Sequence, residues 1–298
     1  MEPLSDVIAL LRPHAAISKP ITARGEWGVR YAAYNMPGFA LVLDGECWLT
    51  LDGRVPARLE RGDFVLLPAT PAFSMTNRPG AACVPGQPTA SAVRHGDAEG
   101  EPDFRMMGGS FRIEPANAPL LLALLPDMIH VRAADTMTLS PIIGLIRDEC
   151  AADRPGGEMI LQRLLEVMLI EALRRETVGK EGSFEAGLLA GLRDPAVAKA
   201  MRAIHAEVGR RWTVAILAEV ACMSRSAFAA RFMATVGCAP IEYLARWRMA
   251  RARDALGRGG TSLDRLAEAI GYESASAFST AFRRRVGCAP GSFARSLQ

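Results

Sequence analysis

Two stretches decide the fold of the C-terminal part of the chain: LAEVACMSRSAFAARFMATVGCAPIEYLAR, residues 217–246, and LAEAIGYESASAFSTAFRRRVGCAPGSFAR, residues 266–295. Their Leu-Ala-Glu starts match at an offset of 49 residues. After one inserted residue, two phenylalanines and the run Val-Gly-Cys-Ala-Pro match at an offset of 50. Self-similarity of this kind means that one supersecondary unit has been built twice.

Each copy predicts a helix, a tight turn and a second helix. The first helices have apolar residues at the i, i+3, i+4 and i+7 spacing of one helix face, namely Val214, Leu217, Ala218 and Ala221, and Leu263, Leu266, Ala267 and Ile270. Thr213 and Ser262 precede these helices as N-caps. The expected turns are Cys222-Met223 and Gly271-Tyr272, the expected caps of the second helices are Ser224 and Ser274, and their buried pairs are Phe228/Phe232 and Phe278/Phe282.

A short helix, a tight turn and a second helix form the helix-turn-helix, whose second helix enters the major groove of DNA. The charge distribution supports this function. Residues 187–298 carry 17 Lys/Arg and 8 Asp/Glu, a net of +9, whereas the whole chain is +3, so residues 1–186 carry −6. A basic segment indicates a polyanionic partner, and we expect double-stranded DNA. The alternatives are a plain helical bundle with solvated arginines and an adaptor that binds protein through them.

A long helix is predicted between the two copies. One of its faces carries Ile241, Leu244, Met249, Ala252 and Leu256, and four arginines project elsewhere, namely Arg246, Arg248, Arg251 and Arg253. We expect this helix to hold the two second helices about one DNA turn apart, roughly 34 Å, so that both read one face of the duplex.

These residues resemble a known family. The second copy fits the signature of AraC/XylS-type transcription regulators at Gly271, Tyr272, Ser274, Ser276, Phe278, Phe282, Arg283, Arg284, Gly287, Pro290, Phe293 and Arg295. The first copy fits it at Met223-Ser224-Arg225, Gly237, Pro240 and Trp247-Arg248-Met249. The resemblance covers about 105 residues and implies a monomeric reading head of seven helices, fused to a sensing or dimerising domain. The further partners that it implies are RNA polymerase, as for an activator, a small-molecule effector and a second copy of the chain.

The outward positions of the recognition helices carry small side chains. The expected DNA-binding positions are Ser224, Arg225, Ser226, Ala229 and Ala230 in the first copy, and Ser274, Ala275, Ser276, Ser279 and Thr280 in the second, followed by Arg283, Arg284 and Arg285 as phosphate contacts. Small side chains cannot form the bidentate pairs that discriminate guanine or adenine strongly. Either Arg225 reads a base directly, or the specificity comes largely from DNA shape; between a base edge and a phosphate for Arg225, we favour the phosphate.

The N-terminal part predicts short strands, at residues 27–34, 39–43, 47–51 and 64–67, with a return strand at 105–112. Asp44-Gly45 predicts a two-residue hairpin and Asp52-Gly53 another reversal. Close turns between short strands are typical of a small barrel or jelly roll, and residues 39–73 resemble the cupin-type sensor domain of AraC-like regulators. The fold class is therefore α+β.

Metal-binding cupins carry histidines at two neighbourhoods that here read Gly38-Phe39-Ala40-Leu41 and Pro68–Phe73. We therefore expect no metal, no cofactor and no catalytic residue, against the alternative of a cupin-type enzyme fused to a DNA-binding domain. A barrel of this size can enclose a small ligand. The residues expected to line such a pocket, or simply to form the core, are Trp27, Tyr31, Phe39, Trp48 and Phe73.

The remaining segments complete the domain organisation. Residues 76–103 are expected to form a long mobile loop that contains His95 and Asp97, with His95 hydrogen-bonded or solvated rather than catalytic. Helices are predicted at 118–125, 141–150 and 159–174, and Asp194-Pro195 opens the first helix of the DNA-binding domain. We expect a sensing or dimerisation domain at 1–175, a linker at 176–190 and the DNA-binding domain at 191–298.

Composition limits the remaining classes. Half of the residues are hydrophobic and 22% are charged, as in a globular protein. No apolar run is long enough to span a bilayer, and the first residues do not form a secretory signal, so we expect a cytoplasmic protein without a membrane partner. The six cysteines contain no CxxC pair, which favours reduced thiols over a disulfide framework or a zinc site.

Overall fold

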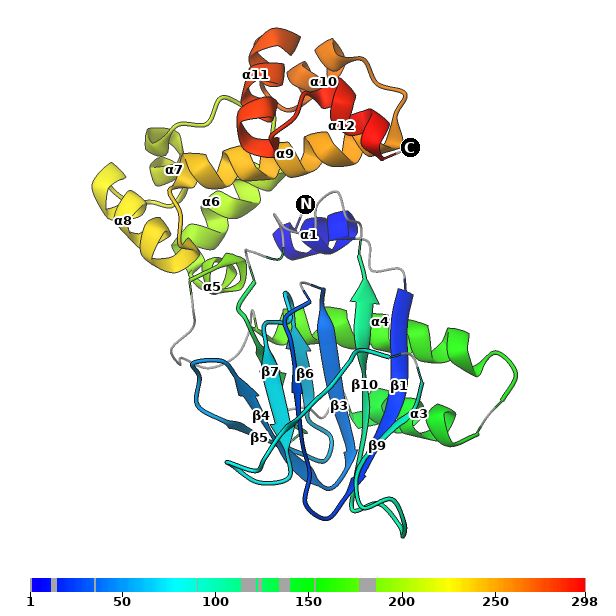
Figure 1. Ribbon diagram of the computed structural model, residues 1–298. Helices are drawn as coiled ribbons and strands as arrows, with labels where there is room; N and C mark the ends of the chain where they lie inside the picture. Colours follow the sequence, from blue (N-terminus) through cyan, green and yellow to red (C-terminus); the bar gives the residue numbers. More distant parts are fainter. Residues whose placement is uncertain are drawn as a thin grey trace. The chain divides into compact units, whose positions relative to one another are not determined.

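The computed structural model describes residues 2–11, 15–34, 36–89, 91–113, 122, 125–133, 140–152, 154–176 and 186–297. The chain forms two compact units (Figure 1). The sheet unit contains Pro13–Ile113 and Asp127–Glu176, and the helical unit contains Met1–Arg12, Glu114–Pro126 and Thr177–Gln298. The first residues thus group with the helical unit, although the sequence suggested that they belong to the sensor domain.

The sheet unit contains two sheets. The strands are β1 (Ala15–Arg24), β2 (Gly28–Tyr31), β3 (Gly38–Asp44), β4 (Glu46–Leu51), β5 (Ala57–Glu60), β6 (Phe64–Leu67), β7 (Phe73–Thr76), β8 (Val84–Pro85), β9 (Val93–Gly96), β10 (Phe104–Arg112) and β11 (Ile129–Val131). One sheet has the order β11-β6-β3-β10-β1-β9 and the other the order β5-β4-β7-β2-β8.

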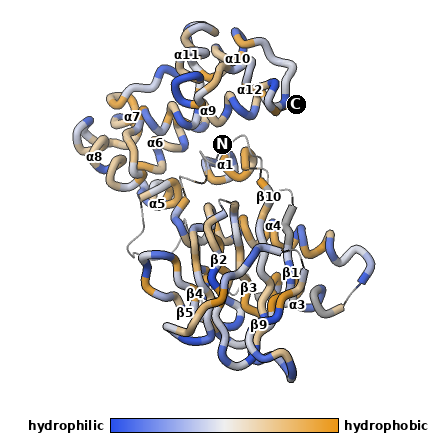
Figure 2. The backbone as a smooth tube through the Cα atoms, viewed as in Figure 1, coloured by the Kyte–Doolittle hydropathy of each residue, from blue (hydrophilic) through white to orange (hydrophobic). Residues whose placement is uncertain are grey.

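Strand alternation explains how the sheets pack. Every second residue of β4, from Cys47 through Leu49 to Leu51, is buried, and these residues share one core with Ala40 and Val42 of β3. Two sheets that bury one face each against a common core form a jelly-roll arrangement. The predicted α+β class with a cupin-like sheet domain is confirmed, with two facing sheets in place of a closed barrel. Figure 2 shows hydrophobic colour gathered in these strands.

The predicted hairpin at Asp44-Gly45 is wrong. β3 pairs with β10 and β6, whereas β4 pairs with β5 and β7, so the chain changes sheets at Gly45. Gly45 has φ +75°, and a Cβ there would lie 2.3 Å from the Asp103 carbonyl oxygen, so glycine serves a close backbone approach as well as a turn. The second reversal, at Asp52-Gly53, does join paired strands, β4 and β5.

The expected mobile loop at 76–103 is also wrong in part. Among its described residues, β8 pairs in parallel with β2, and β9 pairs in parallel with β1. Short strands with two to four residues carry too little periodicity to stand out in a sequence rich in Gly and Pro. The return strand expected at 105–112 is confirmed as β10.

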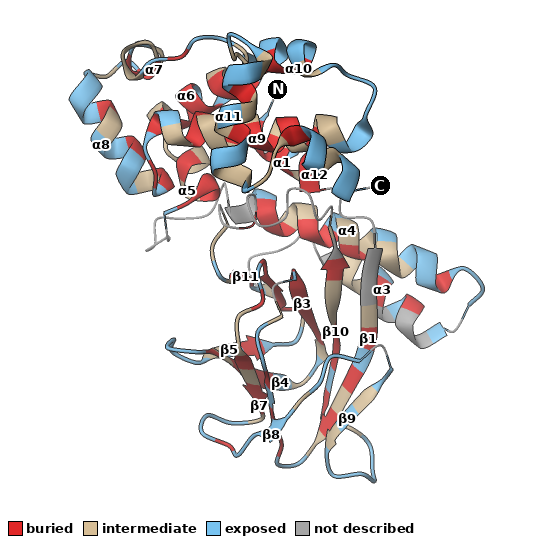
Figure 3. Cartoon of the chain, turned by 45° about the horizontal axis from the view of Figure 1, so that its top comes forward, coloured by how far each residue is buried: buried red, intermediate tan, exposed pale blue. Residues whose placement is uncertain are grey.

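Two helices accompany the six-stranded sheet. α3 (Ser140–Ala152) packs against α4 (Gly157–Glu176), and α4 contacts β1, β6 and β11. The buried face of α4 consists of Leu165, Met168, Leu169, Ala172 and Leu173, and Figure 3 shows buried and exposed residues along the same helix. The helices predicted at 141–150 and 159–174 are confirmed. The helix predicted at 118–125 and the middle of the expected linker fall almost entirely outside the described residues.

The helical unit contains α1 (Pro3–Leu11), α5 (Leu188–Arg193), α6 (Pro195–Ala206), α7 (Val214–Val220), α8 (Arg225–Val236), α9 (Pro240–Arg258), α10 (Leu263–Ala269), α11 (Ala275–Val286) and α12 (Pro290–Ser296). Within the described chain, α6–α12 are seven helices, the number that the resemblance implies. Asp194 caps α6 by accepting from the amides of Ala196 and Val197, as expected, but α5 precedes it and begins inside the expected linker.

The two helix-turn-helix units share their hydrogen bonds as well as their sequence. The four predicted N-caps, Thr213, Ser224, Ser262 and Ser274, each accept from the amide three residues on. In the turns, the Met223 amide donates to the Ala218 carbonyl at 2.9 Å and the Tyr272 amide donates to the Ala267 carbonyl at 2.8 Å. The duplicated unit is therefore confirmed at the level of backbone geometry.

The N-terminal helix α1 contacts α6 and α9. Its Asp6 carboxylate lies 3.0 Å from Nδ1 of His205, and Nε2 of His205 lies 2.8 Å from the Tyr243 hydroxyl. A carboxylate can only accept, so Nδ1 carries the proton and Nε2 accepts from Tyr243. Burial lowers the pKa of His205 despite the opposing effect of Asp6. The ring is therefore neutral at pH 7 and stacks on Trp247 with centroids 4.0 Å apart.

This network predicts acid sensitivity. Because the pKa of His205 is lower in the folded than in the unfolded chain, stability is present above the unfolded pKa of about 6.5 and is lost as pH falls below it, by at most about 1.4 kcal/mol per pH unit for one proton. His205→Gln keeps a donor and an acceptor but cannot titrate. Thermal melts from pH 7.5 to 5 should show a smaller loss of stability for His205→Gln than for the wild type, and parallel profiles would contradict the assignment.

Candidate nucleic-acid interface and sensor cavity

The first recognition helix, α8, presents small side chains to solvent. Phe228 and Phe232 are fully buried on its inner face. Four of the five expected DNA-binding positions, Ser224, Arg225, Ser226 and Ala230, are exposed, and Ala229 is half-buried. Arg225 is the first helical residue and the one long side chain among the five.

The second recognition helix, α11, repeats this arrangement. Phe278 and Phe282 are buried with their ring centroids 5.5 Å apart. The expected positions Ser274, Ser276 and Thr280 are exposed, whereas Ala275 and Ser279 are half-buried. Hydroxyl and methyl groups on this surface can contact a thymine methyl or form single hydrogen bonds. Among the ten expected positions at the starts of the two helices, Arg225 alone has a side chain that could form a bidentate base contact.

The three arginines that end α11 do not have the same role. Arg283 and Arg284 are exposed. Arg285 instead forms two hydrogen bonds to Glu242 of α9, at 2.8 and 2.7 Å. These bonds, together with Arg246, lower the pKa of Glu242 to about 2 despite partial burial. Arg285 was expected from the sequence to contact a DNA phosphate. In the structure its guanidinium is instead held by a charge-assisted bidentate pair with Glu242.

The connecting helix α9 is anchored at both ends. Tyr243 and Leu244 are buried near its start, and Met249 and Ala252 pack with Leu266, Phe278 and Phe282 of the second unit. Figure 1 shows α9 running between the two helix-turn-helix units. The predicted buried face is right except for Ile241, which is 39% exposed. Tyr243 and Trp247 occupy the buried side at this end of the helix instead.

Two of the α9 arginines are structural. The guanidinium of Arg248 donates to the carbonyls of Val208 and Arg210 at 3.0 and 2.8 Å, and Arg253 lies over the Phe293 ring at 5.6 Å. Burial lowers the pKa of both groups. The sequence predicts only that these arginines project away from the apolar face of the helix, because periodicity does not show that long side chains bend over neighbouring elements.

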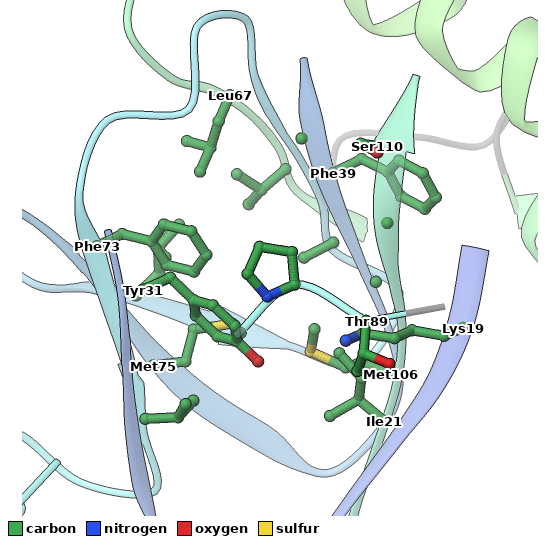
Figure 4. Close-up of a pocket in the computed structure, with 18 of the residues that line it drawn as sticks. Lys19, Ile21, Tyr31, Phe39, Leu67, Phe73, Met75, Thr89, Met106 and Ser110 are labelled. Atoms are coloured by element: carbon green, nitrogen blue, oxygen red, sulfur yellow. The ribbon is translucent and has the colours of Figure 1, made fainter. Parts of the chain in front are cut away.

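A cavity of about 270 Å³ lies in the sheet unit. Its lining comes from both sheets and from the segment before β9: Lys19, Ile21, Trp27, Val29, Tyr31, Tyr34, Gly38, Phe39, Ala40, Leu49, Val65, Leu67, Phe73, Met75, Pro88, Thr89, His95, Met106, Gly108, Gly109 and Ser110. Figure 4 shows apolar and aromatic side chains around the open space. A largely apolar cavity with a few polar groups is typical of a small-molecule site.

Four of the five aromatic residues expected at this site line the cavity. They are Trp27, Tyr31, Phe39 and Phe73, and the rings of Tyr31 and Phe73 stack with centroids 5.1 Å apart. Trp48 is the exception. It alternates with the buried residues Cys47 and Leu49 on β4, so its side chain lies on the opposite face of the sheet and is half-buried.

Two polar residues of the cavity were not predicted from the sequence. Lys19 lies on β1 and is 7% exposed. His95 lies on β9, has its Nε2 atom buried, and stacks on Trp27 with centroids 5.9 Å apart; the expectation of a solvated or hydrogen-bonded His95 is therefore wrong for this atom. The signal that could have revealed Lys19 is its alternation with Ile21 and Ala23, but Pro20 within the stretch argues against a strand.

The described parts of the chain contain neither a candidate metal site nor a candidate membrane-spanning helix. No group of three or more His, Cys, Asp and Glu side chains there is arranged to hold a metal ion. None of the helices described combines the length and the apolar character needed to cross a bilayer.

Models of known protein families match both units of the chain. Residues 2–177 match a family model described as Cupin, and residues 217–296 match one described as Helix-turn-helix domain. A putative AraC-like transcription regulator of Streptomyces lividans is 37% identical over 302 residues, covering 99% of this chain and 98% of the relative. A second one, of Streptomyces antibioticus, is 35% identical over 301 residues, covering 99% of each chain.

An uncharacterized HTH-type transcriptional regulator of Haemophilus influenzae is 27% identical over 304 residues, covering 100% of this chain and 99% of the relative. The similarity thus extends through both units rather than through the helix-turn-helix part alone. With a cupin domain followed by a duplicated helix-turn-helix, and more than a third of its residues identical to those of a full-length relative, the chain belongs to the family of AraC-like transcription regulators.

Proposed function

We propose that this regulator reads a bipartite site on duplex DNA with α8 and α11, and that the cavity of its sheet unit receives a small-molecule effector. The observation that carries the first part is the duplicated turn geometry, with matching caps and backbone hydrogen bonds in both units. Helices presented in this way enter the major groove. The net charge of +9 over residues 187–298 favours the same partner.

Specificity in this proposal comes from few base contacts. Arg225 is placed on a phosphate, because the first residues of a recognition helix lie close to the groove wall. Arg283 and Arg284 supply further phosphate contacts. The small hydroxyl and methyl side chains of α8 and α11 add weak readout, and DNA shape supplies the remainder.

The experiment is a binding-site selection with the full-length wild type and Arg225→Ala, followed by salt titrations on the selected duplex. A phosphate contact predicts a loss that is uniform across sequences and a log K against log salt slope that shrinks by roughly one unit. Loss of preference at a single base pair, with a cost of about 1–3 kcal/mol, would move Arg225 to a base edge. Absence of any duplex binding at low salt would contradict the function itself.

We also propose a homodimer through α3 and α4. Leu145, Met159, Ile160 and Val167 are 42–71% exposed, and Ile160 and Val167 stand two helical turns apart on one side of α4. An apolar stripe of this kind is more often an interface than a solvent face. No catalytic role is proposed for the cavity. RNA polymerase stays a predicted partner, and we propose that the protein acts in the cytoplasm, because it would bind chromosomal DNA there.

A further inference from the structure

The cavity contains a lysine on an inner face that is otherwise built from small and apolar residues. Lys19 of β1 is in register with Gly108 of β10, Gly108 with Ala40 of β3, and Ala40 with Val65 of β6. Partners in register project on the same face, so the lysine lies in a row with a glycine, an alanine and a valine. Small side chains at these positions leave room beside the aliphatic stem of Lys19, which points into the cavity in Figure 4.

His95 belongs to the same end of the cavity. It is in register with Ala23, the third inward residue of β1 after Lys19 and Ile21. Burial lowers the pKa of His95, and the positive charge of Lys19 lowers it further. Burial likewise lowers the pKa of Lys19. Lys19 therefore acts electrostatically on His95, and the described residues that line the cavity include no carboxylate.

Neither group has a hydrogen-bond partner among the described residues. Nζ of Lys19 and Nε2 of His95 are both buried and unsatisfied. Burying polar atoms without a partner is unfavourable, and native proteins keep such atoms mainly where a ligand or a water completes the site. Around them most of the lining is apolar, as at Val29, Leu67, Phe73, Met75 and Met106, and hydroxyl groups are added by Tyr31, Tyr34, Thr89 and Ser110.

We propose that the cavity binds an amphipathic monocarboxylate, with its carboxylate against Lys19 and His95 and its hydrocarbon or aromatic body among the apolar lining residues. One ammonium group and one imidazole match a single negative charge, whereas a doubly charged phosphate would leave charge unpaired in an apolar site. This inference rests on the proposed sensor function of the cavity and names the chemical class of its effector.

The volume sets the size of the ligand. At about 30 Å³ for each water-sized group, the cavity of about 270 Å³ holds roughly nine such groups. Octanoate and 3-phenylpropanoate, with about ten non-hydrogen atoms each, match this size. Their alcohols, 1-octanol and 3-phenylpropanol, keep the body and remove the charge.

Isothermal titration of the full-length protein with these four compounds tests the proposal. At least one carboxylate should bind with one molecule per chain and at least about tenfold more tightly than its alcohol, because hydrogen bonds between charged groups are the strong ones. Because a bound anion favours the ammonium form of Lys19, any proton exchange that accompanies carboxylate binding, measured at pH 8.5 in buffers of different ionisation enthalpy, should be uptake. Equal affinity for acid and alcohol, or no binding of either acid, would overturn the proposal.

Lys19→Met provides the matched variant, because methionine fills a similar volume without charge, and Lys199→Met, which removes an exposed lysine of α6, is its control. In Lys19→Met the carboxylate should bind at least about tenfold more weakly and without proton uptake, while the alcohol changes little. Unchanged carboxylate binding by Lys19→Met would overturn the assignment. The comparison of each carboxylate with its alcohol uses the wild-type protein, so it tests the proposal even if this variant does not fold.

Duplex DNA binding at low salt, measured on the same samples, separates the two hypotheses. Carboxylate binding without any DNA binding would contradict the proposed function and leave the ligand assignment intact. DNA binding without preference for the carboxylate would contradict the ligand assignment and leave the proposed DNA-binding function intact.

Discussion

Replacing Gly271 by alanine should destabilise the second helix-turn-helix by about 2–5 kcal/mol, from about 1–2 for the left-handed backbone and 1–3 for overpacking. Gly271 has φ +80°, and a Cβ there would lie 2.3 Å from both Nη2 of Arg248 and the Gly209 carbonyl oxygen. Because one of these neighbours is backbone, the clash cannot be relieved by a side-chain rotation alone. Displacing Arg248 also breaks its hydrogen bonds to Val208 and Arg210.

Gly287→Ala is the matched control. Gly287 ends α11 with φ +89°, but a Cβ there would meet nothing within 4 Å, so only the backbone strain of about 1–2 kcal/mol applies. Hydrogen exchange of the α10 and α11 amides in the full-length protein measures both variants, since global unfolding of a two-unit chain is not expected to be two-state. Equal protection in the two variants would contradict the role of the contact between Gly271 and Arg248.

The two copies show how much of the reading head follows from local sequence. Caps, turns and buried phenylalanine pairs were predicted residue by residue, because each depends on side chains within one or two helical turns. Yet Cys222 takes the place of Gly271 in the first turn and adopts φ +55° without a glycine. The sequence alone does not show that Arg248 of α9 approaches the second turn at Gly271.

Long-range packing explains the remaining differences. Asp44-Gly45 has the chemistry of a hairpin turn, but β3 and β4 find partners in different sheets, and strand pairing is not fixed by the turn between them. Arg285 was expected to be a phosphate contact, and its pairing with Glu242, 43 residues away in the chain, carries no local signal. Lys19 was not predicted as a cavity residue, because its place in the cavity depends on the long-range register of β1 with Gly108 of β10 and of β10 with Ala40 of β3.

The central claim is that α9 holds α8 and α11 at a fixed separation, so that both read one face of one duplex. The ion pair between Arg285 and Glu242, the stacking of Arg248 over the Tyr272 ring and the shared core around Met249 and Ala252 all fix the second unit to this helix. A rigid spacer demands one spacing between half-sites, near one helical turn. A flexible connection would accept any spacing that returns the second half-site to the same face.

The direct test is the affinity of the full-length protein for its selected duplex and for versions with five or ten base pairs inserted between the half-sites. Both insertions should weaken binding by roughly tenfold or more, because α11 then lies on a non-cognate sequence and each mismatched base pair in a site costs about 1–3 kcal/mol. A sequence-independent insertion outside the two half-sites serves as the control and should leave the affinity unchanged. Unaltered affinity after the five-base-pair insertion, or full recovery after ten, would contradict a rigid two-helix reading head.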